Sequence, residues 1–184
     1  MSGFNYRKSL SGAAQVPAEL QIIGGNSVVF QKGDLIRIDQ DGFAGLVTAG
    51  DLVLGVVTGV VTNKGVPLDP DSGTLDTWTM GSANESTAAQ KYKVQYIPAL
   101  QDYLFYNDSD DTLAQANLMQ FFAVNDENDV DGTTGSDTVL NTVRLVEIDP
   151  DNDGDASKGL WQIVESFWAQ NAGGTVMTDG IEAS

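Results

Sequence analysis

The sequence predicts a mainly β protein: a single barrel-like or sandwich-like domain with an extended N-terminal arm and little helix. Three observations favour this fold class. About nine short β-prone runs follow one another at close spacing, and turn-forming Gly, Asn and Asp residues separate them. Only one short stretch has an apolar spacing typical of a helix. The chain of 184 residues, with a hydrophobic content of 41%, is long enough to bury a substantial core.

The first half of the chain alternates short apolar runs with turns. Residues 1–20 are polar with isolated aromatic side chains, which predicts an extended arm of the kind that packs on a neighbouring subunit; a disordered terminus is the equal alternative. The run 52–61 is apolar on both faces, so we expect it either at the centre of a sandwich or buried at an interface. Further strands are expected at residues 21–23, 27–30, 35–38 and 43–48.

The second half continues this pattern with more polar connections. Residues 66–85 are loop-like, and they are either a functional excursion or hide a strand around 77–80. A helical turn near 115–119, followed by a strand, is favoured over a longer helix capped by Asp111. The remaining strands are expected at 92–97, 103–106, 138–148 and 160–168. The chain therefore divides into an arm at 1–20, a β-rich domain at 21–168 and a flexible tail at 169–184.

The residue types that are missing exclude several kinds of active site. The chain has no Cys, so disulfides and thiolate chemistry are absent. It also has no His, which rules out Ser-His-Asp, Cys-His and histidine-rich zinc sites within this chain. A carboxylate pair, a Lys or a Tyr remains available for catalysis, but no spacing singles one out. We therefore expect a protein that is not an enzyme.

The charge balance limits the partners of this protein. The formal net charge is -17, with 26 acidic and 9 basic residues. Such a chain repels phosphate backbones and anionic lipids, so neither direct nucleic-acid binding nor membrane binding is expected. No apolar run approaches the length that spans a bilayer, and no secretory signal is visible. The excess of carboxylates indicates either a well-solvated surface or sites for divalent cations.

One acidic segment stands out as a candidate metal site. Carboxylates at alternate positions before a Gly match the first half of a D-x-D-x-D-G calcium loop, and a fourth carboxylate follows; the four candidates are Asp149, Asp151, Asp153 and Asp155. An EF-hand is excluded because Leu160 stands where the bidentate Glu belongs and because the flanks are strands. A calcium-binding β-loop and a solvated hairpin turn both remain open.

A weaker match to the same pattern of alternating carboxylates occurs earlier, at Glu127, Asp129, Asp131 and Gly132. A solvated loop is the favoured interpretation there. Two further segments resemble each other, Gly33-Asp34-Leu35-Ile36 and Gly50-Asp51-Leu52-Val53. Gly-Asp before a strand is common turn chemistry, so this similarity is weak support for an internal repeat.

Three stretches resemble the structural proteins of tailed-phage heads. They are KYKVQYIPALQDYLFYNDSD at 91–110, QANLMQFF at 115–122 and VRLVEIDPDNDGDASKGLWQIVES at 143–166. In particular, the chain is similar to the small β-rich decoration, or cement, proteins of phage capsids. In these proteins a Gly-Asp-Leu β unit like that at 33–61 is common, and an extended N-terminal segment often contacts the shell.

The resemblance implies a structural virion protein. It would bind the outer surface of the major capsid protein lattice as a homo-oligomer, with a trimer favoured, and stabilise the shell. The location would be the capsid exterior of a bacteriophage virion, and no cofactor is implied. The alternative from the acidic loop is a calcium-dependent β-rich module that binds a cell-surface or glycan ligand. A carboxylate-based hydrolase is a third class without specific support from spacing.

Overall fold

The computed structural model describes residues 3–12, 18–21, 28–38, 42–48, 50–62, 64–71, 76–80, 92–135, 143–149 and 158–168. The expectation of a mainly β protein is confirmed: three antiparallel sheets account for the named strands. The sole helical element of these residues is a 3₁₀ turn, η3 (Gln115–Asn117). No helix in the described ranges is long and apolar enough to cross a membrane.

Sheet A and sheet B each contain five strands, and sheet C contains two. In order across the sheet, sheet A consists of β1 (Asn5–Ser9), β9 (Tyr103–Asp108), β12 (Lys158–Ile163), β11 (Val143–Ile148) and β10 (Phe121–Phe122). Sheet B consists of β2 (Ala18–Gln21), β8 (Tyr92–Pro98), β6 (Gly55–Thr62), β4 (Leu35–Ile38) and β5 (Ala44–Leu46). Sheet C pairs β3 (Val29–Gln31) with β7 (Thr77–Thr79).

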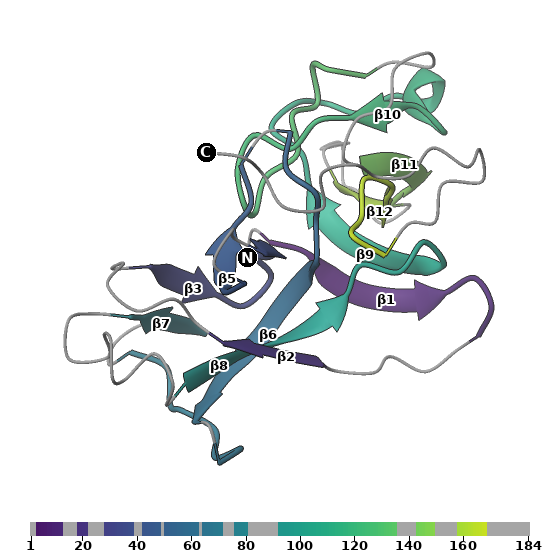
Figure 1. Ribbon diagram of the computed structural model, residues 1–184. Coiled ribbons are helices and arrows are strands. Elements are labelled where there is room, and N and C mark those ends of the chain that lie inside the picture. The colour runs from purple at the N-terminus through teal and green to yellow at the C-terminus, as the bar shows by residue number, and fades with distance from the viewer. Residues whose placement is uncertain are drawn as a thin grey trace.

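The sheets form an open, sandwich-like stack and not a closed barrel (Figure 1). Sheet B is the middle layer, because one of its faces packs on sheet A and the other packs on sheet C. The core between sheets A and B includes Phe105, Trp161 and Ile97. The core between sheets B and C includes Phe30, Trp78 and Val60. Apolar burial on both sides of sheet B is therefore the main stabilising contribution to the fold.

Strand β6 lies at the centre of this stack, which decides between the two positions expected for the apolar run 52–61. Val56 belongs to the core facing sheet A, whereas Val57 and Val60 belong to the core facing sheet C. The apolarity of this run is thus satisfied within the chain. Gly55 is needed for close packing, since a Cβ there would stand 2.4 Å from the carbonyl oxygen of Ile97.

The arm expected at the N-terminus is extended over Asn5–Ser9, where it pairs with β9 of the same chain. Phe4 is fully buried in the core between sheets A and B. The ring of Tyr6 meets that of Tyr103 edge-on, with 5.0 Å between the centroids. A contact between this segment and a neighbouring subunit stays a prediction.

Other expected elements are present with altered ends. The strand suspected within 66–85 is β7, and the helical turn and following strand are η3 and β10. The last strand begins at Lys158 and ends at Ile163, short of the expected Trp168. Beyond it Ser166 forms an isolated bridge with Val53, which lies just before β6. Residues 136–142, and the tail expected at 169–184, lie outside the described residues.

Candidate binding surface

The acidic loop predicted as a metal site connects β11 to β12, the last two strands of sheet A along the chain. Strands β11 and β12 are antiparallel neighbours, and the N–H of Asp149 donates to the carbonyl oxygen of Lys158 at 3.0 Å, closing their pairing. Residues 150–157, which include Asp151, Asp153 and Asp155, lie outside the described residues. Convergence of the four carboxylates on one cation therefore stays a prediction.

The side chain of Asp149 forms a hydrogen bond with Tyr106 of β9, in the same sheet. Burial raises the pKa of the Tyr106 phenol to about 12, and a hydrogen bond with Asp149, together with the charges of Asp149 and Asp108, adds to this rise. The nearby guanidinium of Arg7 acts in the opposite direction. The phenol therefore stays neutral at physiological pH and donates to the carboxylate.

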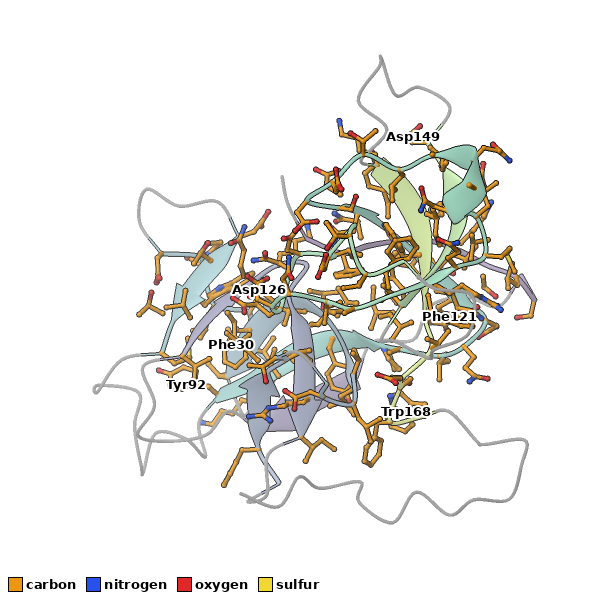
Figure 2. The ribbon with its side chains drawn as sticks, turned by 90° about the horizontal axis from the view of Figure 1, so that it is seen from above. Phe30, Tyr92, Phe121, Asp126, Asp149 and Trp168 are labelled. Carbon is orange, nitrogen blue, oxygen red and sulfur yellow. The ribbon has the colours of Figure 1, made fainter. Side chains whose placement is uncertain are left out.

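The side chains of the weaker acidic segment form hydrogen bonds that hold the local backbone in place. Asn125 Nδ2 bridges two carboxylates, donating to Asp110 at 2.9 Å and to Asp129 at 3.2 Å. Asp131 accepts the N–H of Thr133 at 2.9 Å within a tight turn. Across the part of the chain that the structure describes, no three acidic side chains group as metal ligands. Figure 2 shows Asp126, in this segment, well apart from Asp149.

The two similar Gly-Asp segments share a local geometry. The Oδ2 atom of Asp34 accepts the N–H of Gln31 at 2.6 Å, and that of Asp51 accepts the N–H of Thr48 at 2.7 Å. In both cases the side chain closes a turn on the residue three positions earlier. Both side chains are buried, a feature that turn chemistry alone did not predict. Asp51 is paired with Arg37 at 3.0 Å.

The outer face of sheet A is a surface that no described sheet covers. Alternate residues of its strands point into the core, so their neighbours along each strand point outward. We define the outer face by these outward residues and by Arg7, which stands at a bulge in β1; its members are Asn5, Arg7, Lys8, Leu104, Tyr106, Asp108, Phe121, Arg144, Glu147, Lys158, Leu160 and Gln162. Leu104 and Gln162 are buried beneath their neighbours, and most of the others are half-buried or exposed.

Cations and aromatic rings gather on this outer face. The guanidinium of Arg7 lies 4.9 Å from the ring centroid of Tyr106, and that of Arg144 lies 5.9 Å from that of Phe121. Arg144 also donates to the side-chain oxygen of Gln162. With Lys8 and Lys158, this face carries four of the nine basic residues of the chain. Sequence reasoning missed the cluster because these cations are far apart along the chain.

One ion pair spans the outer face, between Lys8 on β1 and Glu147 on β11, at 3.2 Å. Its side chains are 53% and 49% exposed, so it contributes little to the free energy of unfolding. The Lys8 ammonium therefore exchanges readily between this partner and an incoming one. The outer face is thus able to present positive charge to a partner with little cost in stability.

A pocket beside the N-terminal segment gives no support to acid–base chemistry. This pocket of about 190 Å³ also borders β6, and Phe4, Tyr6, Lys32 and Val57 are among its lining residues. No carboxylate lines it, so it lacks the pair of acids that a carboxylate-based hydrolase requires.

Comparisons with known proteins found no match, so the outer face of sheet A is the main evidence on function. No protein-family model matches the chain, and neither a curated protein nor a solved structure matches it.

Proposed function

We propose that this protein is a structural component of a bacteriophage virion, a decoration protein that binds the outside of the capsid and stabilises the shell. The observation that carries the proposal is the outer face of sheet A, where four of nine cations and two cation-stacked rings gather in a protein of net charge -17. A broad sheet face of this kind suits contact with a rigid protein surface. The three stretches similar to phage-head proteins support the same assignment.

The proposed mechanism is mechanical. Each copy seats the outer face of sheet A on the major capsid protein, and binding to the assembled shell stabilises that state by mass action. A trimer would engage several capsid subunits at once, so that modest individual contacts add up to tight binding. The acidic remainder of the molecule stays solvated and repels other virions and nucleic acid. In this proposal the protein is not an enzyme, needs no cofactor and contacts no membrane.

Binding to capsids that lack the protein tests this proposal. The purified chain is mixed with such capsids, sedimented, and quantified against free concentration. We expect saturable binding that weakens at least about tenfold when Arg7→Glu and Lys8→Glu are combined, since both side chains are exposed on the outer face. The matched control combines Lys32→Glu with Lys64→Glu, which changes the net charge equally at exposed positions outside this face.

The control pair should bind like the unchanged chain. Absence of binding to capsids would refute the proposed role. Equal losses in the two double variants would show that net charge, and not the outer face, governs binding.

A calcium-dependent module for a cell-surface or glycan ligand is the alternative. The position of Asp149 directly after β11, at the start of the acidic loop, favours it. In that case calcium would be required for binding, whereas capsid attachment through the outer face proceeds in the presence of a chelator.

A further inference from the structure

Asp34 is a buried carboxyl held in a fixed position. Its side chain is 2% exposed, in the turn between β3 and β4. The turn is tied to β6, because the N–H of Val57 donates to the Asp34 carbonyl oxygen at 2.8 Å. Oδ2 accepts the N–H of Gln31 at 2.6 Å. Oδ1 is also buried, and no donor among the described residues reaches it in hydrogen-bonding geometry.

The segment facing Asp34 is the acidic tip at 126–129, which is anchored to the core at both ends. Val124 and Val130 are buried and form a bridge to each other. The tip then contacts the Asp34 turn directly, since the N–H of Leu35 donates to the carbonyl oxygen of Glu127 at 2.5 Å. A second tie runs from Asn107 Nδ2 to the carbonyl oxygen of Asn128 at 3.1 Å.

The charged groups that act on Asp34 from this tip are both acidic, namely Glu127 and Asp126. From β6 and from the N-terminal segment the turn receives backbone groups, those of Val57 and Phe4. No cation among the described residues lies within ion-pair distance of Asp34. An ionised Asp34 would thus be a buried charge with one unsatisfied oxygen facing two more carboxylates, which is a costly arrangement.

Neutralisation by a proton removes that cost. Burial raises the pKa of Asp34 to about 7, and repulsion from Glu127 and Asp126 adds to the rise, while the N–H of Gln31 and the Asn128 side chain oppose it. The pKa of Asp129, at the end of the same tip, is raised as well, first by burial and then by the charges of Asp110 and Asp126. The protonated form is therefore favoured at Asp34 up to about neutral pH.

We infer that the contact between the Asp34 turn and the acidic tip is a proton-dependent latch, closed when Asp34 carries a proton and released when it does not. A neutral carboxyl carries no charge to repel Glu127 and Asp126, so the closed state needs no cation. The sign follows from the direction of the shift: the native state binds the proton more tightly than the unfolded chain. Stability from the latch is full below pH 3.8, the ordinary pKa, and is lost as pH rises through about 7. This inference is independent of the proposed capsid binding.

Amide hydrogen exchange of the wild-type chain, from about pH 5 to about pH 9 and corrected for intrinsic rates, tests the latch. The Leu35 amide reports on it, because its acceptor is the Glu127 carbonyl oxygen. The Leu54 amide, which lies just before β6 and donates to the carbonyl oxygen of Ile36 in β4 at 2.7 Å, is the internal control. We expect Leu35 to lose at least about tenfold in protection as pH rises through about 7, with Leu54 unchanged. Constant protection of Leu35 would overturn the inference.

Two variants separate Asp34 from other buried acids. Asp34→Asn keeps an acceptor for Gln31 and cannot ionise, so it should remove the pH dependence of the Leu35 amide. Asp51→Asn changes the other buried Gly-Asp carboxyl and should leave that dependence in place. An identical pH dependence in Asp34→Asn and the wild type would overturn the inference.

Carbon-13 titration of the wild-type Asp34 carboxyl covers the case in which the first variant fails to fold. A midpoint near pH 7 that coincides with the loss of Leu35 protection is expected. A midpoint near the ordinary value of 3.8 contradicts the latch.

Discussion

A single buried amide, that of Asn107, joins three separate segments of the chain. Its Oδ1 accepts the N–H of Gly3 at 3.0 Å and its Nδ2 donates to Asn128 at 3.1 Å. Its carbonyl oxygen accepts the indole N–H of the buried Trp161 at 3.0 Å. The N-terminal segment, sheet A and the acidic tip therefore meet at one residue that is 1% exposed.

Substitution of Asn107 should be strongly destabilising. Asn107→Ala leaves the Gly3 N–H and the Asn128 carbonyl without partners, so we expect a loss of about 2–4 kcal/mol in the free energy of unfolding. Urea denaturation followed by fluorescence measures it as a shift in midpoint at constant slope. Asn5→Ala, at an exposed position, is the control and should cost less than about 1 kcal/mol. A loss at Asn107 no greater than that at Asn5 would contradict this account.

At the scale of elements, β6 shows which expectations were secure. Its long apolar run predicted a buried strand, and the strand is present from Gly55 to Thr62. The neighbours of this strand were harder to predict, because a run that is apolar on both faces predicts burial but not which segments cover it. β1 was less visible still, since Asn5–Ser9 is polar and its partner β9 begins only at Tyr103. The burial of Asp34 likewise depends on contact with a distant segment, the acidic tip at 126–129, so no local sequence pattern predicted it.

Two glycines of β6 provide a matched test of the packing around that strand. A Cβ at Gly55 would stand 2.4 Å from both the Ile97 carbonyl oxygen and the Tyr96 ring, whereas one at Gly59 would meet only the Gln95 side chain, at 3.7 Å. Gly55→Ala should therefore destabilise the protein by about 1–3 kcal/mol, because backbone must shift. Gly59→Ala should cost less than about 1 kcal/mol. Thermal unfolding of both variants checks this, and equal costs would count against the described packing of β6 on β8.

Calcium binding by the loop between β11 and β12 is tested through its effect on stability. If the loop carboxylates converge, Ca²⁺ at about one hundred times its dissociation constant should stabilise the fold by about 2.7 kcal/mol. Combining Asp151→Ala with Asp153→Ala should abolish the gain. Mg²⁺ at equal concentration is the control, because it demands tighter octahedral geometry. Equal shifts with both ions, or a shift that survives in the double variant, would identify general charge screening instead.

For the whole molecule, the dominant feature is its charge. A net charge of -17 opposes compaction by self-repulsion, and the described ion pairs offset little of it. Because the protein as a whole is so acidic, the cations gathered on the outer face of sheet A are a distinctive feature of its surface. The fold class followed from composition and turn spacing, but this cluster did not, because only the sheet topology brings Arg7 and Arg144 onto the same face.

Salt should therefore stabilise this protein. Raising NaCl from about 0.05 M to about 0.5 M shortens the Debye length and screens the repulsion. We expect a gain of about 1 kcal/mol, or about 2–4 °C in melting temperature for a chain of this size. Differential scanning calorimetry measures the change, with sucrose of equal osmolality as the uncharged control. A fall in melting temperature with salt would mean that attractive pairs dominate the electrostatics.

The proposal that this chain decorates a phage capsid is tested most directly by electron cryo-microscopy of the particle from which it comes. The account predicts density for the three-layer β fold on the capsid exterior, with the outer face of sheet A, including Arg7 and Lys8, against the major capsid protein. Density for the chain inside the shell, at the tail only, or with sheet C against the capsid would contradict it.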